Sequence, residues 1–342
     1  MHRNDLLVPL PLALLLVAAS AAGKADGQKT VLVDCSKGQS IQAALKDKAE
    51  ELIVEIRGIC DEDVVVTRSH VTLRGADPAF DGLRGVGGLG VPAYSVVQVE
   101  GVRDVRLESL RVEGGLASGV GLRGSGPVEI HDCRIVDNLR DGVAVSASSF
   151  ATVTDTELAG NGRSGVAGFQ GELLICRRCA ISGSRQGALV INGTRVSLED
   201  STISATFGVL AAEGAPIVWV RDTTVTGDVF SLWATEDADI FVTGGKLDGS
   251  IVAEQKSMLV LDGVEQTAQT VGQNLLDLGT IARLTGGATL LGPVSVEAFS
   301  NLAIQGGAID GDLTCSSGGD AFCADPAAIS GAVTGCGQCI KP

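Results

Sequence analysis

A short motif returns about every 22 residues along the middle of this 342-residue chain, and no other feature restricts the fold as strongly. Each copy is a run of alternating apolar residues, one bend residue and a further apolar position. The bend residues follow one another at steps of 23, 23, 23, 22, 22 and 22; they are Ser109, Asp132, Asp155, Arg178, Asp200, Asp222 and Gly244. A constant period of this length predicts a solenoid, because a single unit cannot bury its apolar side and must stack on its neighbours.

Each repeat predicts one coil of short parallel strands. A second apolar run follows the bend, for example GVAVSA (142–147) and GVAGFQ (165–170). Gly is abundant, with 46 residues, and this suits short strands joined by tight turns. The frames of leucine-rich repeats and of calcium-binding nonapeptides are missing, and the period is not a multiple of six. We therefore expect one elongated, all-β domain.

The two ends predict different structures. Residues 1–22 have a short basic start, an apolar stretch and small residues at a cleavage site, which predicts a signal peptide and a secreted chain. Residues 23–62 predict an N-terminal cap, in which an amphipathic helix from Gln39 towards Glu51 covers the first coil. The coils follow over 63–311, and a cysteine-rich cap occupies 312–342.

Nine cysteines in an exported chain predict disulfides and at least one remaining thiol. Cys35 and Cys60 flank the helix-like segment and are expected to pair. Cys133 is the candidate for the free thiol, since Cys179 lies two coils away, at about 10 Å. The pair Cys336–Cys339 also has the spacing of a redox or zinc motif, but terminal disulfides are favoured. Three connectivities remain open for the tail cysteines Cys315, Cys323, Cys336 and Cys339.

The charge of the chain excludes one class of partner. The formal net charge is −15, and residues 201–342 carry 5 basic against 16 acidic side chains. Residues 101–200 are nearly balanced, with 11 Arg against 12 Asp and Glu. Nucleic acid binding requires a basic stripe, so we expect no nucleic acid partner. No stretch after the signal predicts a membrane helix, and we expect a monomer without membrane insertion.

Several segments resemble the right-handed parallel β-helix, or pectin-lyase-like, superfamily. They are the opening DCSKGQSIQAAL with EIRGIC and VTLRG, and the coils VEIHDCRIVDN and ATVTDTELAGNGRSGVAG. The resemblance covers residues 31–310 and implies a single-stranded right-handed parallel β-helix. The superfamily includes pectate lyases, polygalacturonases, phage tailspikes and non-catalytic surface proteins. An extracellular polysaccharide is therefore the implied partner, while the fold alone implies no particular reaction.

The resemblance also suggests candidate site residues in the bend column and in the column just before it. In pectate-lyase-like relatives, carboxylates on stacked coils hold calcium and an arginine takes a proton beside a uronic acid. In polygalacturonase-like relatives, aspartates act as acid and base. Calcium is thus expected only for a lyase, and no other cofactor or metal is expected. The candidate catalytic residues are Asp155, Arg178 and Asp200, and the candidate substrate-binding residues are Asp132, Arg177, Asp222 and Trp219.

A structural interpretation of the same columns is simpler. An Asp at a bend accepts a hydrogen bond from its own backbone, and a ladder of mixed charges stabilises the stack. Asn138 and Asn161 occupy matching turns and predict a short amide ladder. No local active-site motif of either enzyme class stands out. The sequence therefore favours a non-catalytic, polysaccharide-contacting or surface scaffold protein. The alternatives are a lyase or hydrolase acting on uronic-acid polymers and an adhesin-like surface protein.

Geometry discriminates between these functions. An enzyme requires outward-facing carboxylates beside an arginine in a groove that admits a sugar chain. Carboxylates that instead pair within the ladder would remove the support for catalysis.

Overall fold

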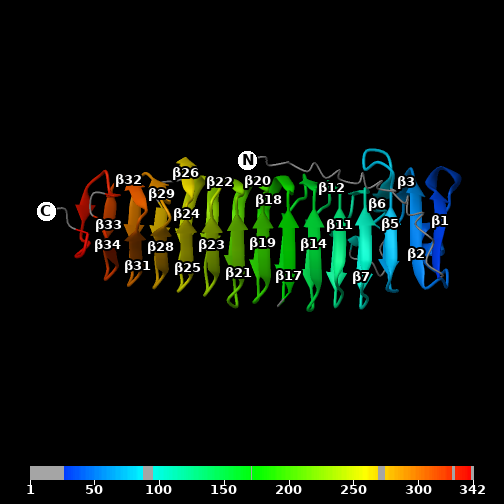
Figure 1. The fold of residues 1–342 in the computed structure, drawn as a ribbon, viewed down its shortest axis with the longest axis horizontal. Helices are drawn as coiled ribbons and strands as arrows, with labels where there is room; N and C mark the ends of the chain where they lie inside the picture. The colour runs from blue at the N-terminus through cyan, green and yellow to red at the C-terminus, as the bar shows by residue number, and fades with distance from the viewer. Residues whose placement is uncertain (1–26, 88–94, 171, 269–273, 326–327, 340–342) are drawn as a thin grey trace, which may run out of the picture.

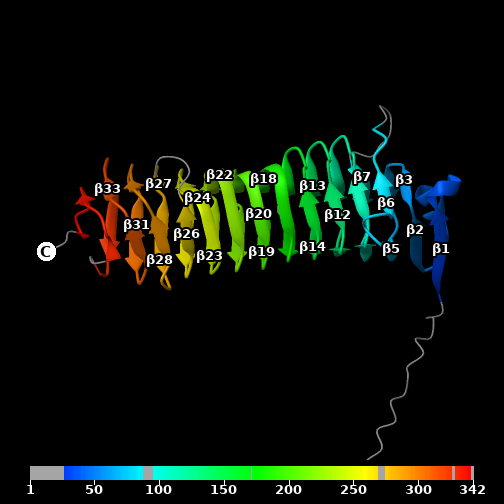
Figure 2. The ribbon, with the colours of Figure 1, turned by 90° about the horizontal axis from the view of Figure 1, so that it is seen from above.

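The computed structural model describes residues 27–87, 95–170, 172–268, 274–325 and 328–339. The chain is wound into a straight rod of stacked coils, with one strand per coil visible along its face (Figure 1). The same order of coils is seen from above (Figure 2). The parallel β-solenoid predicted from the repeat is confirmed. The predicted signal peptide, residues 1–22, lies outside the described residues.

Sheet A contains 14 strands, one from each coil, hydrogen-bonded in sequence order. Its strands are β1 (Gln28–Asp34), β2 (Glu51–Arg57), β5 (Val71–Arg74), β8 (Val105–Glu108), β11 (Val128–His131), β14 (Phe150–Thr154), β17 (Leu173–Arg177), β19 (Arg195–Glu199), β21 (Ile217–Arg221), β23 (Asp239–Thr243), β25 (Met258–Asp262), β28 (Ile281–Thr285), β31 (Asn301–Gln305) and β34 (Asp320–Cys323).

Sheet B contains the other 21 strands. Most coils contribute a short strand after the bend and a second strand after a further corner, and the two are continuous in β18, β20, β22 and β24. The strands are β3 (Ile59–Asp61), β4 (Val64–Val66), β6 (Gly82–Arg84), β7 (Ser95–Glu100), β9 (Arg111–Glu113), β10 (Ser118–Arg123), β12 (Arg134–Val136), β13 (Asp141–Ser146), β15 (Glu157–Ala159), β16 (Ser164–Phe169), β18 (Ala180–Ile191), β20 (Thr202–Ala212), β22 (Thr224–Ala234), β24 (Lys246–Ala253), β26 (Glu265–Ala268), β27 (Asn274–Leu276), β29 (Thr289–Leu291), β30 (Val294–Val296), β32 (Ala308–Asp310), β33 (Leu313–Cys315) and β35 (Val333–Thr334).

The core follows from the alternation of apolar residues along each strand. Val128 and Ile130 of β11 point inward and are fully buried, and they lie in register with Ala151 and Val153 of β14. Parallel stacking repeats this register from coil to coil, so that like residues form continuous inner columns. The predicted columns are therefore present.

The bend column adopts left-handed backbone geometry. Asp132, Asp155, Arg178, Asp200 and Asp222 have φ values between 46° and 52°. The backbone amide of each residue donates a hydrogen bond to a carbonyl of the next coil; for example, Asp155 N donates to the Arg177 carbonyl at 3.1 Å. Asp and Asn tolerate this conformation better than most residues. The predicted positions thus line up on successive coils.

The predicted N-terminal capping helix is wrong. Only one turn, α1 (Ile41–Ala44), is α-helical, after a 3-10 turn η1 (Cys35–Lys37). Ser40 and Glu62 satisfy the first amides of α1, but Asp47 then accepts a hydrogen bond from Ala49 N and turns the chain into β2. So short a helix is costly to nucleate. Strand β1, which precedes it, is the first strand of sheet A.

Four disulfides are present. Cys35–Cys60 confirms the predicted pair, and the tail pairs as Cys315–Cys336 and Cys323–Cys339. Cys336 and Cys339 therefore have different partners and do not form a redox or zinc pair with each other. The fourth bond, Cys176–Cys179, was not predicted, whereas Cys133 is the free buried thiol as expected.

Four disulfides indicate an oxidising compartment, in agreement with an extracellular or periplasmic protein. Within the described part of the chain, no helix has the length and apolar character needed to cross a membrane.

Candidate functional site

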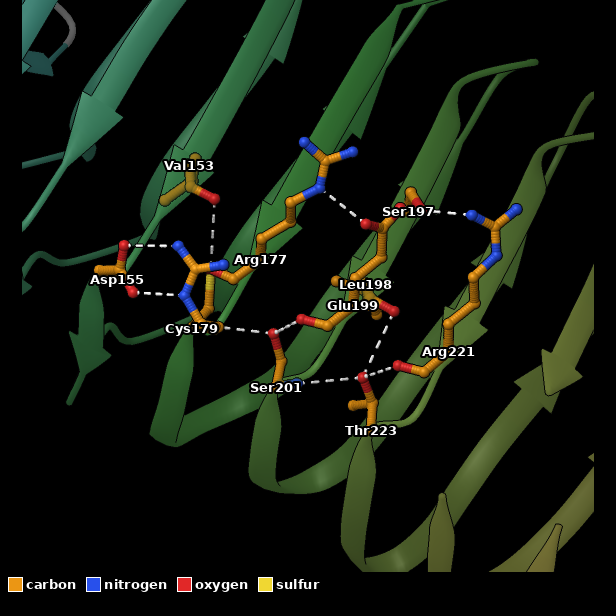
Figure 3. Close-up of polar contacts among 11 residues, drawn as sticks. Val153, Asp155, Arg177, Cys179, Ser197, Leu198, Glu199, Ser201, Arg221 and Thr223 are labelled. Carbon is orange, nitrogen blue, oxygen red and sulfur yellow. Dashed lines mark hydrogen bonds and ion pairs between the residues drawn. The ribbon is translucent and has the colours of Figure 1, made fainter. Parts of the chain in front are cut away.

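Three of the predicted site residues, Asp155, Arg177 and Arg178, take part in a ladder of ion pairs at the ends of the sheet A strands (Figure 3). Arg178 donates from Nε and Nη2 to the two carboxylate oxygens of Asp155, at 2.6 and 2.7 Å. On the neighbouring column, Arg177 Nε lies 2.7 Å from Glu199, and Arg221 Nη1 lies 3.5 Å from the same carboxylate. We call these five residues the polar ladder.

The arginines of the polar ladder keep its carboxylates ionised. The hydrogen bond from Arg178 holds the pKa of Asp155 below its usual value, and the bond from Arg177 does the same to the pKa of Glu199. A carboxylate in this state is a poor general acid, and its oxygens are already occupied. The polar ladder thus has the internal pairing that removes the support for catalysis.

Hydroxyl groups behind the polar ladder support its structural interpretation. Ser201 Oγ donates to the Glu199 carbonyl at 2.7 Å, and Thr223 Oγ1 donates to the Arg221 carbonyl at 2.8 Å (Figure 3). The amide of Cys179 donates in turn to Ser201 Oγ. These bonds satisfy the backbone at successive bends.

The remaining predicted residues do not join this cluster. Asp132 accepts a hydrogen bond from Ser109 Oγ at 2.8 Å, one coil earlier. Asp200 lies beyond Arg178; the pKa of that arginine is raised chiefly by its hydrogen bond to Asp155, and attraction to Asp200 adds to the effect. Asp222 occupies the same column further along. Trp219 is half-buried on the outer face of sheet A, in register between Ser197 and Phe241.

A second site, which the sequence reasoning missed, lies on the outer face of sheet B. It is a cleft of about 410 Å³ over strands β10, β13 and β16. We call it the arginine cleft, and its defining side chains are Arg123, Arg140, Asp141, Arg163 and Phe169.

Three arginines are stacked on successive coils beside this cleft. Arg163 N donates to the Arg140 carbonyl at 2.6 Å, and Gln186 N, next to Arg185, donates to the Arg163 carbonyl at 2.7 Å. Coils repeat at about 4.8 Å, so the backbone positions of Arg140, Arg163 and Arg185 form a column with that spacing. The signal was present in the sequence as a repeated Arg-x-Gly in LRDGV (139–143), GRSGV (162–166) and SRQGA (184–188).

One carboxylate in the cleft is neutralised internally. Arg163 Nε donates to Asp141 Oδ1 at 2.8 Å, and Ser118 Oγ donates to Oδ2 at 3.3 Å. The Asp141 side chain is only 2% exposed, against 26% for Arg163. The Arg163 guanidinium also lies 4.8 Å from the centre of the Phe169 ring. Asp141 therefore positions Arg163 and is not a free acid or base.

Arg140 and Arg123 complete the cleft as unpaired cations. Both are exposed, and among the described residues neither forms an ion pair with a carboxylate. Small residues make the floor between them. At Gly121 a side chain would approach Ser95 Oγ to 2.3 Å, so only glycine leaves this part of the floor open. Ala144 follows Gly121 in the same column.

The chemistry of the cleft suits an anion. Its three arginines face one carboxylate, in a protein whose net charge is −15. A guanidinium presents paired donors that match the oxygens of a carboxylate or sulfate. Over the described ranges, no group of three or more His, Cys, Asp or Glu side chains is placed to hold a metal ion.

Comparison with known proteins identifies the fold. Residues 95–247 match the family model "Right handed beta helix region". Together with the parallel coils, this match confirms the right-handed β-helix over these residues. The search of curated proteins found no match.

Solved structures of similar shape have low identity to this chain. Tailspike protein 2 from Escherichia coli O157:H7 bacteriophage CAB120 has a TM-score of 0.46 and 9% identity, over 78% of this chain and 38% of that one. This chain thus spans well under half of the tailspike. Alginate lyase from Paenibacillus sp. str. FPU-7 has a TM-score of 0.37 and 14% identity, covering 91% and 97%. The A-module of the Azotobacter vinelandii mannuronan C-5 epimerase AlgE4 has a TM-score of 0.41 and 13% identity, covering 88% and 92%.

Proposed function

We propose that this right-handed β-helix protein is a secreted, non-catalytic binding protein for acidic polysaccharides, and that the arginine cleft is its binding site. The supporting observation is the pair Arg140 and Arg163, stacked on successive coils in an open cleft that Arg123 also lines. Along such stacked coils, a polyanion with one charge per sugar unit places each charge beside the guanidinium group of one coil.

A polymer suits this site better than a small anion. A small anion requires one or two guanidinium groups, whereas the arginines here repeat along the axis of the rod at about 4.8 Å. That spacing is comparable to the length of one sugar unit in an extended chain. The disulfides agree with an extracellular setting, in which acidic polysaccharides are common ligands.

The geometry supports binding rather than reaction. In the cleft, Asp141 is buried and bound by Arg163, and in the polar ladder Asp155 and Glu199 are bound by arginines. None of these three carboxylates is free to act as a base or a nucleophile. A lyase or hydrolase acting on uronic-acid polymers and an adhesin-like surface protein remain the two alternatives.

Affinity electrophoresis tests the proposal. The native protein is run through gels containing polygalacturonate, a sulfated polysaccharide or neutral dextran, at low and high salt. We expect retardation by the acidic polymers, weaker at high salt, and none by dextran. Arg140→Ala is expected to lose about 10-fold in affinity, since one charge-assisted contact is removed. Arg283→Ala, an exposed arginine on the outer face of sheet A, is the matched control.

Two outcomes would contradict this function. Equal retardation by dextran would show that charge does not carry the recognition. An equal loss in Arg283→Ala would show that any surface cation suffices. Incubation with the same polymers, followed by measurement of reducing ends and of ultraviolet-absorbing unsaturated uronates, tests the enzyme alternative. Product that is lost in Arg178→Ala would support catalysis in the polar ladder instead.

A further inference from the structure

We propose that the saccharide track continues beyond the arginine cleft to a second subsite, formed by an aromatic cluster and a polar depression on strands β18, β20 and β22. The occupant is a sugar unit of the same polymer chain, so this inference rests on the proposed function. We call this site the aromatic subsite.

Three aromatic side chains form the first half of the aromatic subsite. The Phe207 ring centre lies 6.0 Å from that of Phe230 and 5.9 Å from that of Trp233, and the last two are 5.5 Å apart. All three are half-buried on the outer side of sheet B. Trp233 Nε1 donates to Glu254 Oε1 at 3.0 Å, which fixes the orientation of its ring. Only 3% of the residues in this chain are aromatic, so such a group is an unusual feature of its surface.

A polar depression of about 390 Å³ forms the second half. Its lining includes the side chains of Ser184, Arg185, Thr206 and Asp228. The Arg185 guanidinium lies 5.9 Å from the centre of the Phe207 ring, so the depression and the cluster adjoin. Hydroxyl, guanidinium and carboxylate groups beside an aromatic face are the groups that bind sugar hydroxyls and the apolar face of a sugar ring.

Ser184 lines the depression but keeps its hydroxyl buried beneath the surface. Ser184 is 95% buried, with 5% of its surface exposed, and its Oγ has no hydrogen-bond partner among the described residues. The reason is that the turn ladder of Asn138 and Asn161 ends here, because the residue in register with Ser184 on the next coil is Ala205.

The aromatic subsite lies directly in line with the arginine cleft. Asp141, Ser164, Gln186 and Phe207 are in register on four successive coils. Three steps of about 4.8 Å separate Asp141 from Phe207 by about 14 Å along the rod. A disaccharide held at Arg140 and Arg163 therefore does not reach Phe207, whereas a hexasaccharide does. In this arrangement, an acidic sugar unit binds in the arginine cleft, and a later sugar unit of the same chain stacks on the Phe207 ring.

Calorimetric titration with galacturonate oligomers of defined length tests this inference. The wild-type protein is expected to bind the hexasaccharide more tightly than the disaccharide. Phe207→Leu, which keeps apolar bulk but removes the aromatic face, is expected to lose about 3- to 10-fold for the hexasaccharide and nothing for the disaccharide. Arg140→Ala is expected to weaken both. The matched control is Phe241→Leu, a half-buried aromatic on the outer face of sheet A.

Fluorescence gives a readout that does not depend on a mutation in the subsite. The chain has two tryptophans, so Trp219→Phe leaves Trp233 as the only one. We expect the hexasaccharide, but not the disaccharide, to change the emission of Trp233. Equal affinity of both oligomers, or an unchanged emission with bound hexasaccharide, overturns the aromatic subsite and leaves the arginine cleft intact. Failure of both oligomers to bind overturns both proposals.

Discussion

Arg163 donates a hydrogen bond of 2.8 Å to Asp141 while its guanidinium lies over the Phe169 ring. The Asp141 side chain is almost fully buried. The Arg163 side chain is therefore fixed by two contacts, one with this buried carboxylate and one with the Phe169 ring. An orientation fixed in this way presents the free edge of the guanidinium to the cleft. The same ion pair therefore stabilises the coil and orients the Arg163 side chain in the binding cleft.

Removal of Arg163 is expected to destabilise the protein. Arg163→Ala leaves the buried Asp141 carboxylate without its cation, and breaking a buried pair costs about 3 kcal/mol. Thermal unfolding should show a clearly lower midpoint, and hydrogen exchange should locate the loss at β13 and β16. The control is Arg177→Ala, whose pair with Glu199 is more exposed and contributes less than about 1 kcal/mol. A larger effect in the control would contradict the prediction.

Acid is expected to weaken the polar ladder. The pKa of Asp155 is lowered from its ordinary value of 3.8, chiefly by the hydrogen bond from Arg178. A group with a lowered folded-state pKa stabilises the protein above its unfolded pKa, and this contribution is lost as the pH falls through the folded value. The unfolding midpoint should therefore fall on acidification below pH 3.8.

Arg178→Ala tests the cause of this pH dependence. Without Arg178, the pKa of Asp155 should return towards its ordinary value, and the variant should lose less stability than the wild type over the same acidic range. The comparison is made by thermal unfolding at several pH values. An identical acid profile in the two proteins would show that Asp155 is not held by Arg178.

Cys133 is expected to be unreactive in the folded protein. It is the one unpaired cysteine among the nine, and burial raises the pKa of its thiol to about 12. The thiolate is the nucleophile, so alkylation by iodoacetamide should be negligible until the protein unfolds. Mass spectrometry without a reductant should find one modified cysteine after denaturation. Rapid labelling of the native protein would show that this coil opens.

Reduction of the disulfides is expected to loosen the ends before the middle. The terminal bonds close loops with sequence separations of 25, 21 and 16, whereas Cys176–Cys179 has a separation of only 3. In the chain-entropy model, longer loops give more stabilisation, about 3 kcal/mol for 15 residues. Hydrogen exchange after reduction should rise first at β1–β3 and β33–β35. Loss of protection that starts at β17 would contradict this expectation.

The sequence repeat predicted which residues stack on successive coils, but it did not predict the arginine cleft. Asp155 and Arg178 were expected one coil apart because identical positions must stack, and the structure places them in bidentate contact. The helix expected over Gln39 to Glu51 failed because local turn formation by Asp47 was stronger than the apolar spacing. Cys176–Cys179 was missed because a bond across one bend leaves no long-range pattern.

By itself, the sequence determined the stacked columns, since a fixed period of apolar residues has only one way to bury them, and it determined Cys35–Cys60. Only the tertiary structure decided which arginines form ion pairs with carboxylates and which remain available in a cleft. Arg178 and Arg140 look alike along the chain, yet the first is bound to Asp155 and the second faces an open cleft. The physical reason is that pairing depends on the partner one coil away and on the space above it, and both are set by how the coils stack.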